Sequence, residues 1–383
     1  MRRLFCIKLF ALLLLGVCSS AQAMNVLPYV MSSQDFYRAW PDQRPLSEQL
    51  SAVVNSPADP INMRQVSPVR VAFLLSGKAS SIENKSLLLS FKRRMKELGI
   101  AYQITVYDHL QSLKVANPFE LIKKEKPNYL VATDLNVMQS HVVERVLQQG
   151  KIKVIFFNLS TPLKNWKYQP PFMYVGFNQL KTVQTLASYL DRQLPKNTKL
   201  AALVLPSGYL NDLRCNGFLD AMASRNRHIG YVQAVANNEE AAYVAARRIL
   251  RKTPNAFIFS CTQSISNGVV RAIKTYHNSH PHQVKSKAER VSEEGGLPSA
   301  QTNSWGLSVH EVDHLINGPV MVSSLFMWDD LAIAVAEGIK GSMEGKAEPM
   351  LYVGRTMIMS PEQDSTSLHL MLQQAYRYSA VIW

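Results

Sequence analysis

Short apolar segments alternate with longer amphipathic segments along most of this chain, and this alternation constrains the fold more than any other feature. The first apolar run, 69–75 (VRVAFLL), ends at a turn around Gly77, and helical spacing follows at 87–98. Parallel strands need a crossover between them, which is usually a helix. The alternation therefore predicts an α/β fold in which parallel sheets carry helices on both faces.

The predicted elements fall into two series. The first has strands at 69–75, 102–107, 129–133 and 153–158, with helices at 87–98, around Leu121 and at 142–149. The second has strands at 200–205, 230–236 and 256–261, with helices at 180–194, 212–223 and 239–251. Segment 277–299 breaks this rhythm and is predicted to be an inserted loop or helix, after which the chain resumes with a strand at 320–325, a helix at 331–343 and a strand at 351–358.

Two series in a chain of 383 residues predict two lobes, each with its own core. We expect an N-terminal extension at 24–66, an N-terminal lobe at 67–177 plus 306–344, and a C-terminal lobe at 178–305 plus 345–383. The chain would then cross between the lobes near Asn178, Trp305 and Gly345. These three crossings would form a three-stranded hinge.

The first 23 residues have the pattern of a secretory signal peptide. Arg2 and Arg3 precede an apolar run at 9–15, and Ala21-Gln22-Ala23 matches a cleavage site. The run is too short to span a bilayer about 30 Å thick, and no later run is longer. We therefore expect export to the periplasm of a Gram-negative bacterium, while lipid attachment through Cys18 is the less favoured alternative.

Charge and composition narrow the classes of function. Hydrophobic residues make up 47% and charged residues 18%, which is typical of a globular chain. Removal of the three basic residues of the signal peptide lowers the formal net charge from +14 to about +11. A positive balance suits an anionic membrane surface, an acidic partner or solubility, whereas export argues against nucleic acid as a partner.

Two cysteines remain after the signal peptide is removed. Cys215 and Cys261 would be able to form one disulfide in an oxidising compartment, which is too few to hold the whole fold. Two buried free thiols are the slightly favoured prediction.

Polar residues directly after predicted strands are candidates for a ligand site. In open parallel sheets, ligands bind outside the carboxyl ends of the strands. Residues in such positions are Ser76, Lys78, Ser81, Asn84, Thr133, Asn158, Arg214, Gln263, Ser264 and Trp305. Taken singly, each has a plain structural explanation, such as a helix cap for Ser81. Their convergence from both lobes predicts a site for a polyhydroxylated ligand, which needs donors, acceptors and an aromatic face.

From about Phe36 to Tyr378, the chain resembles the autoinducer-2 receptors of the LuxP family, which belong to the ribose-binding type of periplasmic protein. The resemblance rests on 129–133 (YLVAT), 158–162 (NLSTP), 172–177 (FMYVGF), 208–214 (GYLNDLR) and 303–306 (NSWG). It implies the type I periplasmic binding protein fold, with two doubly wound parallel-sheet lobes on a hinge. It also implies a receptor that signals to a membrane sensor histidine kinase.

The resemblance implies ligand-binding roles for a defined set of residues. Residues that match the family's contacts are Ser81, Thr133, Asn158, Arg214 and Trp305. Residues that stand where the family has other side chains, or that would compensate for them, are Lys78, Asn84, Gln263, Ser264 and Phe326. Phe326 replaces a second arginine. Loss of one charge-assisted pair costs about 1.5 to 3 kcal/mol, so an anionic borate diester should bind weakly unless Lys78 compensates.

One motif suggests an enzyme. His310, Glu311 and His314 satisfy H-E-x-x-H, which on a helix holds zinc. The predicted helix ends before Gly318, its apolar stripe leaves both histidines toward solvent, and no third ligand is evident, so we reject a metal site. The chain also lacks a phosphate-binding glycine loop and a nucleophile elbow.

We therefore expect a binding protein with no catalytic residues and no cofactor. The favoured partners are a small polyhydroxylated ligand, either autoinducer-2 or a sugar, and a membrane sensor kinase. Two alternatives stay open: the sugar-binding component of an ABC importer, and a ligand-independent partner of a membrane sensor.

Overall fold

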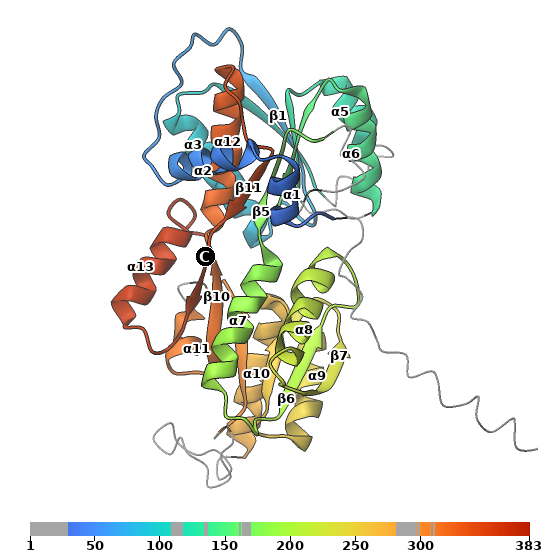
Figure 1. Ribbon diagram of the computed structural model, residues 1–383, viewed down its shortest axis with the longest axis vertical. Coiled ribbons are helices and arrows are strands. Elements are labelled where there is room, and N and C mark those ends of the chain that lie inside the picture. The colour runs from blue at the N-terminus through green and yellow to red at the C-terminus, as the bar shows by residue number, and fades with distance from the viewer. Residues whose placement is uncertain are drawn as a thin grey trace, which may run out of the picture.

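The computed structural model describes residues 30–108, 118–133, 137–160, 162, 170–280, 297, 299–306, 308 and 311–383. Over these residues the chain forms two α/β lobes, one above the other in Figure 1, each built on a six-stranded sheet. The strand orders are β11-β5-β4-β3-β1-β2 in the N-terminal lobe and β12-β10-β9-β8-β6-β7 in the C-terminal lobe. Neighbouring strands are parallel except β10 and β12. The predicted fold class is confirmed.

The strands of the N-terminal lobe are β1 (Val69–Leu74), β2 (Tyr102–Tyr107), β3 (Tyr129–Thr133), β4 (Lys153–Phe157), β5 (Met173–Phe177) and β11 (Leu351–Gly354). Those of the C-terminal lobe are β6 (Leu200–Val204), β7 (Ile229–Ala234), β8 (Phe257–Ser260), β9 (Gln301–Trp305), β10 (Val320–Phe326) and β12 (Thr356–Met359). The central strands β3 and β6 are buried throughout, whereas the edge strands β2 and β7 are partly exposed. Burial on both faces explains why β3 and β6 are nearly continuous apolar runs in the sequence, whereas the central strand β9 (QTNSW) is buried but mostly polar.

Helices cover both sheets. They are α1 (Ser33–Ala39), α2 (Gln43–Val54), α3 (Ile82–Glu97), α5 (Pro118–Glu125), α6 (Val137–Gln149), α7 (Gln179–Gln193), α8 (Gly217–Ala223), α9 (Glu239–Lys252), α10 (Gln263–Ser279), α11 (Val312–Ile316), α12 (Trp328–Met343) and α13 (Ser365–Ala375). A π-helical segment, η2 (Asn211–Asn216), precedes α8. Side-chain caps begin α3 at Ser81, α7 at Asn178 and α10 at Thr262.

The crossings between the lobes differ from the prediction in two places. The chain leaves the first sheet after Phe177, but it returns only after β10, and it crosses again between β11 and β12. The expected crossings near Trp305 and Gly345 are therefore wrong, because β10 pairs with β9 and β12 in the second sheet. The described residues of segment 306–327 belong to the C-terminal lobe, and β11 belongs to the N-terminal lobe.

The predicted N-terminal extension packs on the N-terminal lobe where it is described. Phe36 is fully buried in one cluster with Leu74 and Tyr174. The Ser47 hydroxyl donates a hydrogen bond to the carbonyl oxygen of Leu351. The predicted signal peptide lies outside the described residues, as does most of the predicted insertion. Its first residues, 277–279, continue α10.

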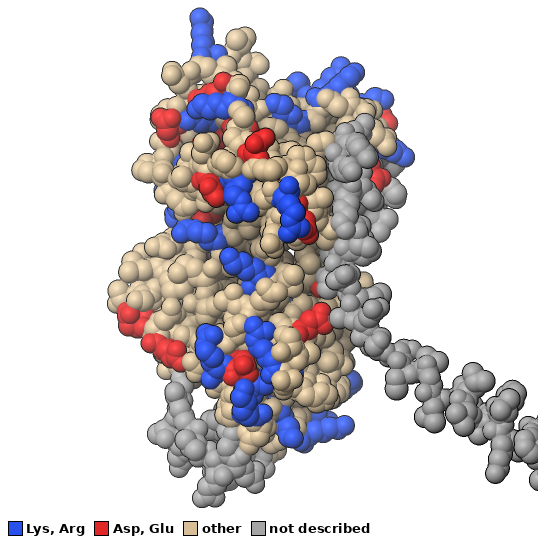
Figure 2. All heavy atoms as spheres, in the orientation of Figure 1, with Lys and Arg blue, Asp and Glu red and all other residues tan. Residues whose placement is uncertain are grey.

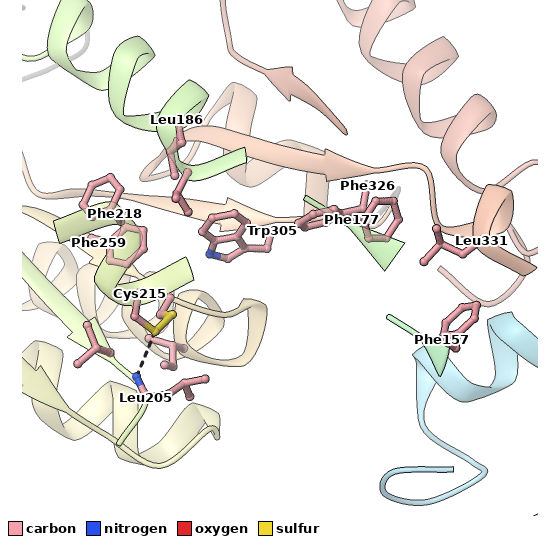
Figure 3. Packing of buried hydrophobic residues seen from close by; sticks show 14 of the residues in the cluster. Phe157, Phe177, Leu186, Leu205, Cys215, Phe218, Phe259, Trp305, Phe326 and Leu331 are labelled. Carbon is pink, nitrogen blue, oxygen red and sulfur yellow. Dashed lines mark hydrogen bonds between the residues drawn. A yellow bond between two sulfur atoms is a disulfide. The ribbon is translucent and has the colours of Figure 1, made fainter. Parts of the chain in front are cut away.

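Cys215 and Cys261 form a disulfide, so the prediction of two free thiols is wrong. Their Cα atoms are 5.4 Å apart and both residues are fully buried. Cys215 lies in η2 and Cys261 follows β8, so the bond ties a helical segment to the end of a central strand. Figure 3 shows the Leu205 backbone N–H donating to the Cys215 sulfur at 3.4 Å.

The carboxyl group of Glu348 is half-buried against α12, where a Cβ atom at Gly341 would overlap its Oε1. Burial is the main cause that raises the pKa of Glu348 to about 7. The charge of Lys346 lowers this pKa, whereas the charges of Glu337 and Glu344 raise it. The folded carboxyl thus keeps a proton that the unfolded one has released above about pH 4.5. This group should therefore lower the free energy of unfolding as the pH rises from about 4.5 to 7.

We predict that Glu348→Gln flattens this pH dependence and raises the melting temperature at neutral pH, because the amide cannot ionise. Thermal unfolding at several pH values checks it. Glu120→Gln, at an exposed position on α5, is the control and should change neither quantity. If the two variants have the same pH profile, the carboxyl of Glu348 is not the group responsible.

Candidate functional site

A cavity of about 970 Å³ lies between the lobes, at the carboxyl ends of strands from both sheets. Of the ten predicted site residues, nine line it: Ser81, Asn84, Thr133, Asn158, Arg214, Gln263, Ser264, Trp305 and Phe326. Lys78 does not line the cavity and is exposed to solvent. Figure 3 shows Trp305 and Phe326 in the C-terminal lobe, with Phe157 of the N-terminal lobe across from them.

Arg214 is held rigidly in the C-terminal lobe. Its Nε and one Nη donate hydrogen bonds of 3.0 and 2.9 Å to Gln179 Oε1, and the other Nη donates one of 3.3 Å to the Cys261 carbonyl oxygen. The guanidinium lies over the Trp305 ring, 4.3 Å from its centroid, and 5.2 Å from that of Phe326. The π-helical turn of η2 places it here, and such turns are frequent at functional sites.

The charge of Arg214 is not neutralised by a carboxylate in the described part of the chain. Burial lowers the pKa of its guanidinium to about 9, and no Asp or Glu counters that effect. Three of its five N–H groups donate to the protein, which leaves two for a ligand in the cavity. An acceptor oxygen placed there would gain a charge-assisted hydrogen bond.

Gln263 positions Trp305. Its Oε1 accepts a hydrogen bond of 2.7 Å from the Trp305 backbone N–H, and its Nε2 donates one of 2.8 Å to Asn267 Oδ1. The Trp305 indole N–H donates to the Ser260 carbonyl oxygen at 2.6 Å, and its ring stacks near Phe326. Trp305 thus offers the cavity a fixed aromatic edge and no free donor.

On the N-terminal lobe, two side chains shape the loop after β1. Asn84 Nδ2 donates hydrogen bonds of 3.0 and 2.9 Å to the carbonyl oxygens of Ser76 and Lys78. Thr133 Oγ1 accepts one of 2.8 Å from the Ser76 backbone N–H, and Ser81 caps α3. Asn84 is therefore a loop-holding residue, whose amide nitrogen is already used.

Asn158 follows β4 in a left-handed conformation, with φ of 63°. Asparagine tolerates this conformation better than most residues. Its Oδ1 is buried and has no hydrogen-bond partner in the described structure. A buried acceptor without a partner costs about 1 to 3 kcal/mol, which a ligand hydroxyl would recover.

Several lining residues were not singled out from the sequence. They include Asn237, Asn267, Ser308, Trp328 and Trp383. Asn237 comes soon after β7, so the rule of strand ends would have found it. Trp328 and Trp383 stack with ring centroids 6.1 Å apart. Trp328 comes soon after the predicted strand at 320–325, so the same rule would have found it, whereas Trp383 follows no predicted strand.

The H-E-x-x-H residues form no metal site where they are described. His310 lies outside the described residues. Glu311 Oε2 accepts from the Ser308 backbone N–H at 3.0 Å, and His314 Nδ1 lies 3.3 Å from Lys274 Nζ. No group of three His, Cys, Asp or Glu side chains among the described residues is arranged to hold a metal ion.

No protein-family model matches this chain. Solved structures of similar fold include a periplasmic solute-binding protein of an ABC transporter from Actinobacillus succinogenes 130z with bound D-allose, at 17% identity and a TM-score of 0.62, covering 78% of this chain and 99% of that one. A periplasmic ribose ABC transporter protein from Conexibacter woesei DSM 14684 has 11% identity and a TM-score of 0.65, covering 82% and 98%. A chain of the XylFII-LytSN complex has 14% identity and a TM-score of 0.58, covering 78% and 100%.

These similarities establish the fold, which is that of the type I periplasmic binding proteins. They do not test the closer resemblance to autoinducer-2 receptors, which stays a prediction. Among the described residues, no helix is both long and apolar enough to cross a membrane.

Proposed function

We propose that this chain is an exported periplasmic receptor that closes its two lobes over a small polyhydroxylated ligand. The observation that carries the proposal is the interlobe cavity with Arg214 buried in its wall, stacked on Trp305 and paired with no carboxylate among the described residues. A cation in this setting needs an acceptor from outside the chain. Asn158 adds a buried acceptor without a partner, which calls for a hydroxyl donor.

The site favours an uncharged ligand over an anionic borate diester. Arg214 is the one Lys or Arg side chain among the described residues that line the cavity. Phe326 is buried between Phe177 and Trp328 and contributes no donor. Glu83 and Glu311 also line the cavity, so its charged side chains together would not favour an anion. The set suits a sugar, or autoinducer-2 without borate, better than a full negative charge.

Closure would couple the ligand to a partner. The three crossings after Phe177, Phe326 and Gly354 lie together at the waist between the lobes (Figure 1). A ligand that contacts both lobes favours the closed arrangement by its differential affinity for that state.

A membrane sensor kinase is the partner we propose, following the resemblance to autoinducer-2 receptors. The fold shared with a chain of the XylFII-LytSN complex supports a protein partner. An ABC importer is the second candidate, and the ABC transporter proteins of similar fold favour it. Deleting the gene separates the two: a receptor's loss abolishes the response to its ligand, whereas an importer's loss abolishes uptake.

Calorimetric titration of the mature protein tests the proposed ligand class. The probes are autoinducer-2 with and without borate, ribose and galactose. We expect saturable binding of at least one of them, with no gain from borate. A cleft inert to all four would contradict the proposed class and favour a ligand-independent partner; tight binding only with borate would contradict the charge argument.

Asn158→Gly gives a sharper test of the cleft. Glycine accepts φ of 63° without strain, so the change removes the amide and leaves the backbone as it is. We predict about threefold to tenfold weaker binding of the ligand found by titration, the value of one hydrogen bond. Asn226→Gly, at another left-handed asparagine with φ of 57°, is the matched control and should bind normally. Equal affinity of the two variants would remove Asn158 from the site.

A further inference from the structure

A second cavity lies at the far end of the C-terminal lobe, opposite the interlobe cleft. Its volume is about 780 Å³, and it is formed where β6 and β7 begin and α9 ends. The cleft lies at the other ends of these strands, so the two cavities are separated by the length of the sheet. Figure 2 shows Lys and Arg side chains gathered toward the lower end of this lobe.

The lining of this distal cavity carries positive charge. It contains six Lys or Arg residues and no Asp or Glu: Lys196, Lys199, Arg227, Arg248, Arg251 and Lys252. Walls of one sign focus the electric potential inside a cavity and attract counter-ions.

Only part of this charge is neutralised. Arg227 is buried and donates 2.7 Å to Asp191 Oδ1, and Lys196 Nζ lies 3.2 Å from the same oxygen. Lys199, Arg248 and the two basic residues that end α9 have no hydrogen bond or ion pair from their side chains within the described chain. Basic residues in the last turn of a helix offset its dipole, but Lys199 and Arg248 lie outside that turn.

A buried hydroxyl in the same cavity also lacks a partner. Thr198 lines the cavity and is 8% exposed, and its Oγ1 has no hydrogen-bond partner. Buried hydroxyl groups are almost always hydrogen-bonded. A buried hydroxyl without a partner beside a cluster of cations therefore indicates that an acceptor from outside the chain is missing.

We propose that this distal cavity binds a phosphate-bearing ligand. Arg248 and Arg251 are three residues apart and therefore share one face of α9, where two forked guanidinium groups can hold neighbouring phosphate oxygens. The Thr198 hydroxyl supplies a further donor. The volume exceeds that of one phosphate, and the ring of Tyr231 lines the rest, so the ligand carries an uncharged body beside its phosphates.

Two sources can supply this chemistry, a soluble phosphate ester and a phospholipid headgroup. Inorganic pyrophosphate is the soluble probe, and vesicles of phosphatidylglycerol, with phosphatidylcholine for comparison, are the membrane probe. Binding of pyrophosphate alone assigns a soluble ligand. Binding of phosphatidylglycerol vesicles, sensitive to the substitutions below, assigns a headgroup.

Two variants test the site by independent routes. The double variant Arg248→Ala with Arg251→Ala removes two cations, and Gly230→Asp adds a carboxylate where a Cβ atom would meet only the Leu200 carbonyl oxygen at 3.9 Å. Each should weaken binding of the probe at least about tenfold, as expected for charge-assisted contacts. Lys123→Ala with Lys124→Ala, both exposed on α5 of the other lobe, removes the same charge and should have no effect.

Thermal unfolding shows whether each variant is folded. The proposal is overturned if neither probe binds, or if the double variant and Gly230→Asp both bind as the unsubstituted protein does. Binding lowered equally by the α5 control would also overturn it, because the effect would then come from net charge.

Discussion

Arg214→Met is expected to weaken binding of the cleft ligand by about one to two orders of magnitude, while the protein stays folded. The magnitude is that of losing a charge-assisted hydrogen bond, about 1.5 to 3 kcal/mol. Methionine keeps the stacking volume beside Trp305 and Phe326 but offers no donor. The affinity therefore measures the two N–H groups of Arg214 that the protein leaves unused.

Stability should change little in this variant because two effects oppose each other. Removing a buried cation that no carboxylate neutralises relieves a desolvation cost, which the lowered pKa of Arg214 records. The change also leaves Gln179 Oε1 without its donor, at about 1 to 3 kcal/mol. The double variant with Gln179→Met removes that orphan and should be at least as stable as the unsubstituted protein.

Calorimetry and thermal unfolding of the same preparations check both statements. Arg225→Met is the matched control, since Arg225 bonds to Ser188 and the Ala221 carbonyl oxygen in the same lobe, away from the cleft. Unchanged affinity in Arg214→Met would show that the ligand does not use this guanidinium. Global unfolding of the variant would show that Arg214 is a structural cation instead.

The architecture could be predicted because buried parallel strands leave a strong pattern. The run 129–133 matches β3 at both ends, and 69–75 extends only one residue beyond β1. The sequence pattern does not show to which lobe a strand belongs. Both sheets use the same apolar residues, so the placement of β10 in the second sheet depends on pairing with β9, which only the structure shows.

The cleft residues could be predicted from their place after strands, since parallel strands bring their carboxyl ends to one edge. Whether each of these side chains is available to a ligand could not be predicted. Asn84 and Gln263 have the right chemistry for a ligand, but the protein already uses their amide groups. Whether a polar atom is already bonded depends on backbone atoms far away in the sequence, such as the Trp305 N–H.

Opening the disulfide should destabilise the protein by about 3 to 4 kcal/mol, as expected for a cross-link closing a loop of this length. Cys215 and Cys261 are separated by 46 residues, a segment that contains α8, α9 and two strands of the C-terminal lobe. Without the bond, the unfolded chain gains the freedom of that whole segment. Cys215→Ala with Cys261→Ala should therefore unfold at lower urea concentration, with a steeper slope because the denatured chain without the cross-link is less compact.

The same bond should also matter for the cleft. Cys215 is next to Arg214, and the Cys261 carbonyl oxygen accepts one of the Arg214 hydrogen bonds, so loosening either end frees the guanidinium to move. We expect weaker ligand binding in the double alanine variant as well as lower stability. A reductant should reproduce both losses in the unsubstituted protein and have no effect on the variant, which contains neither cysteine. Equal unfolding midpoints with and without the disulfide would show that the segment between the cysteines is already ordered by packing alone, and that the lobe needs no covalent tie to hold Arg214 in place.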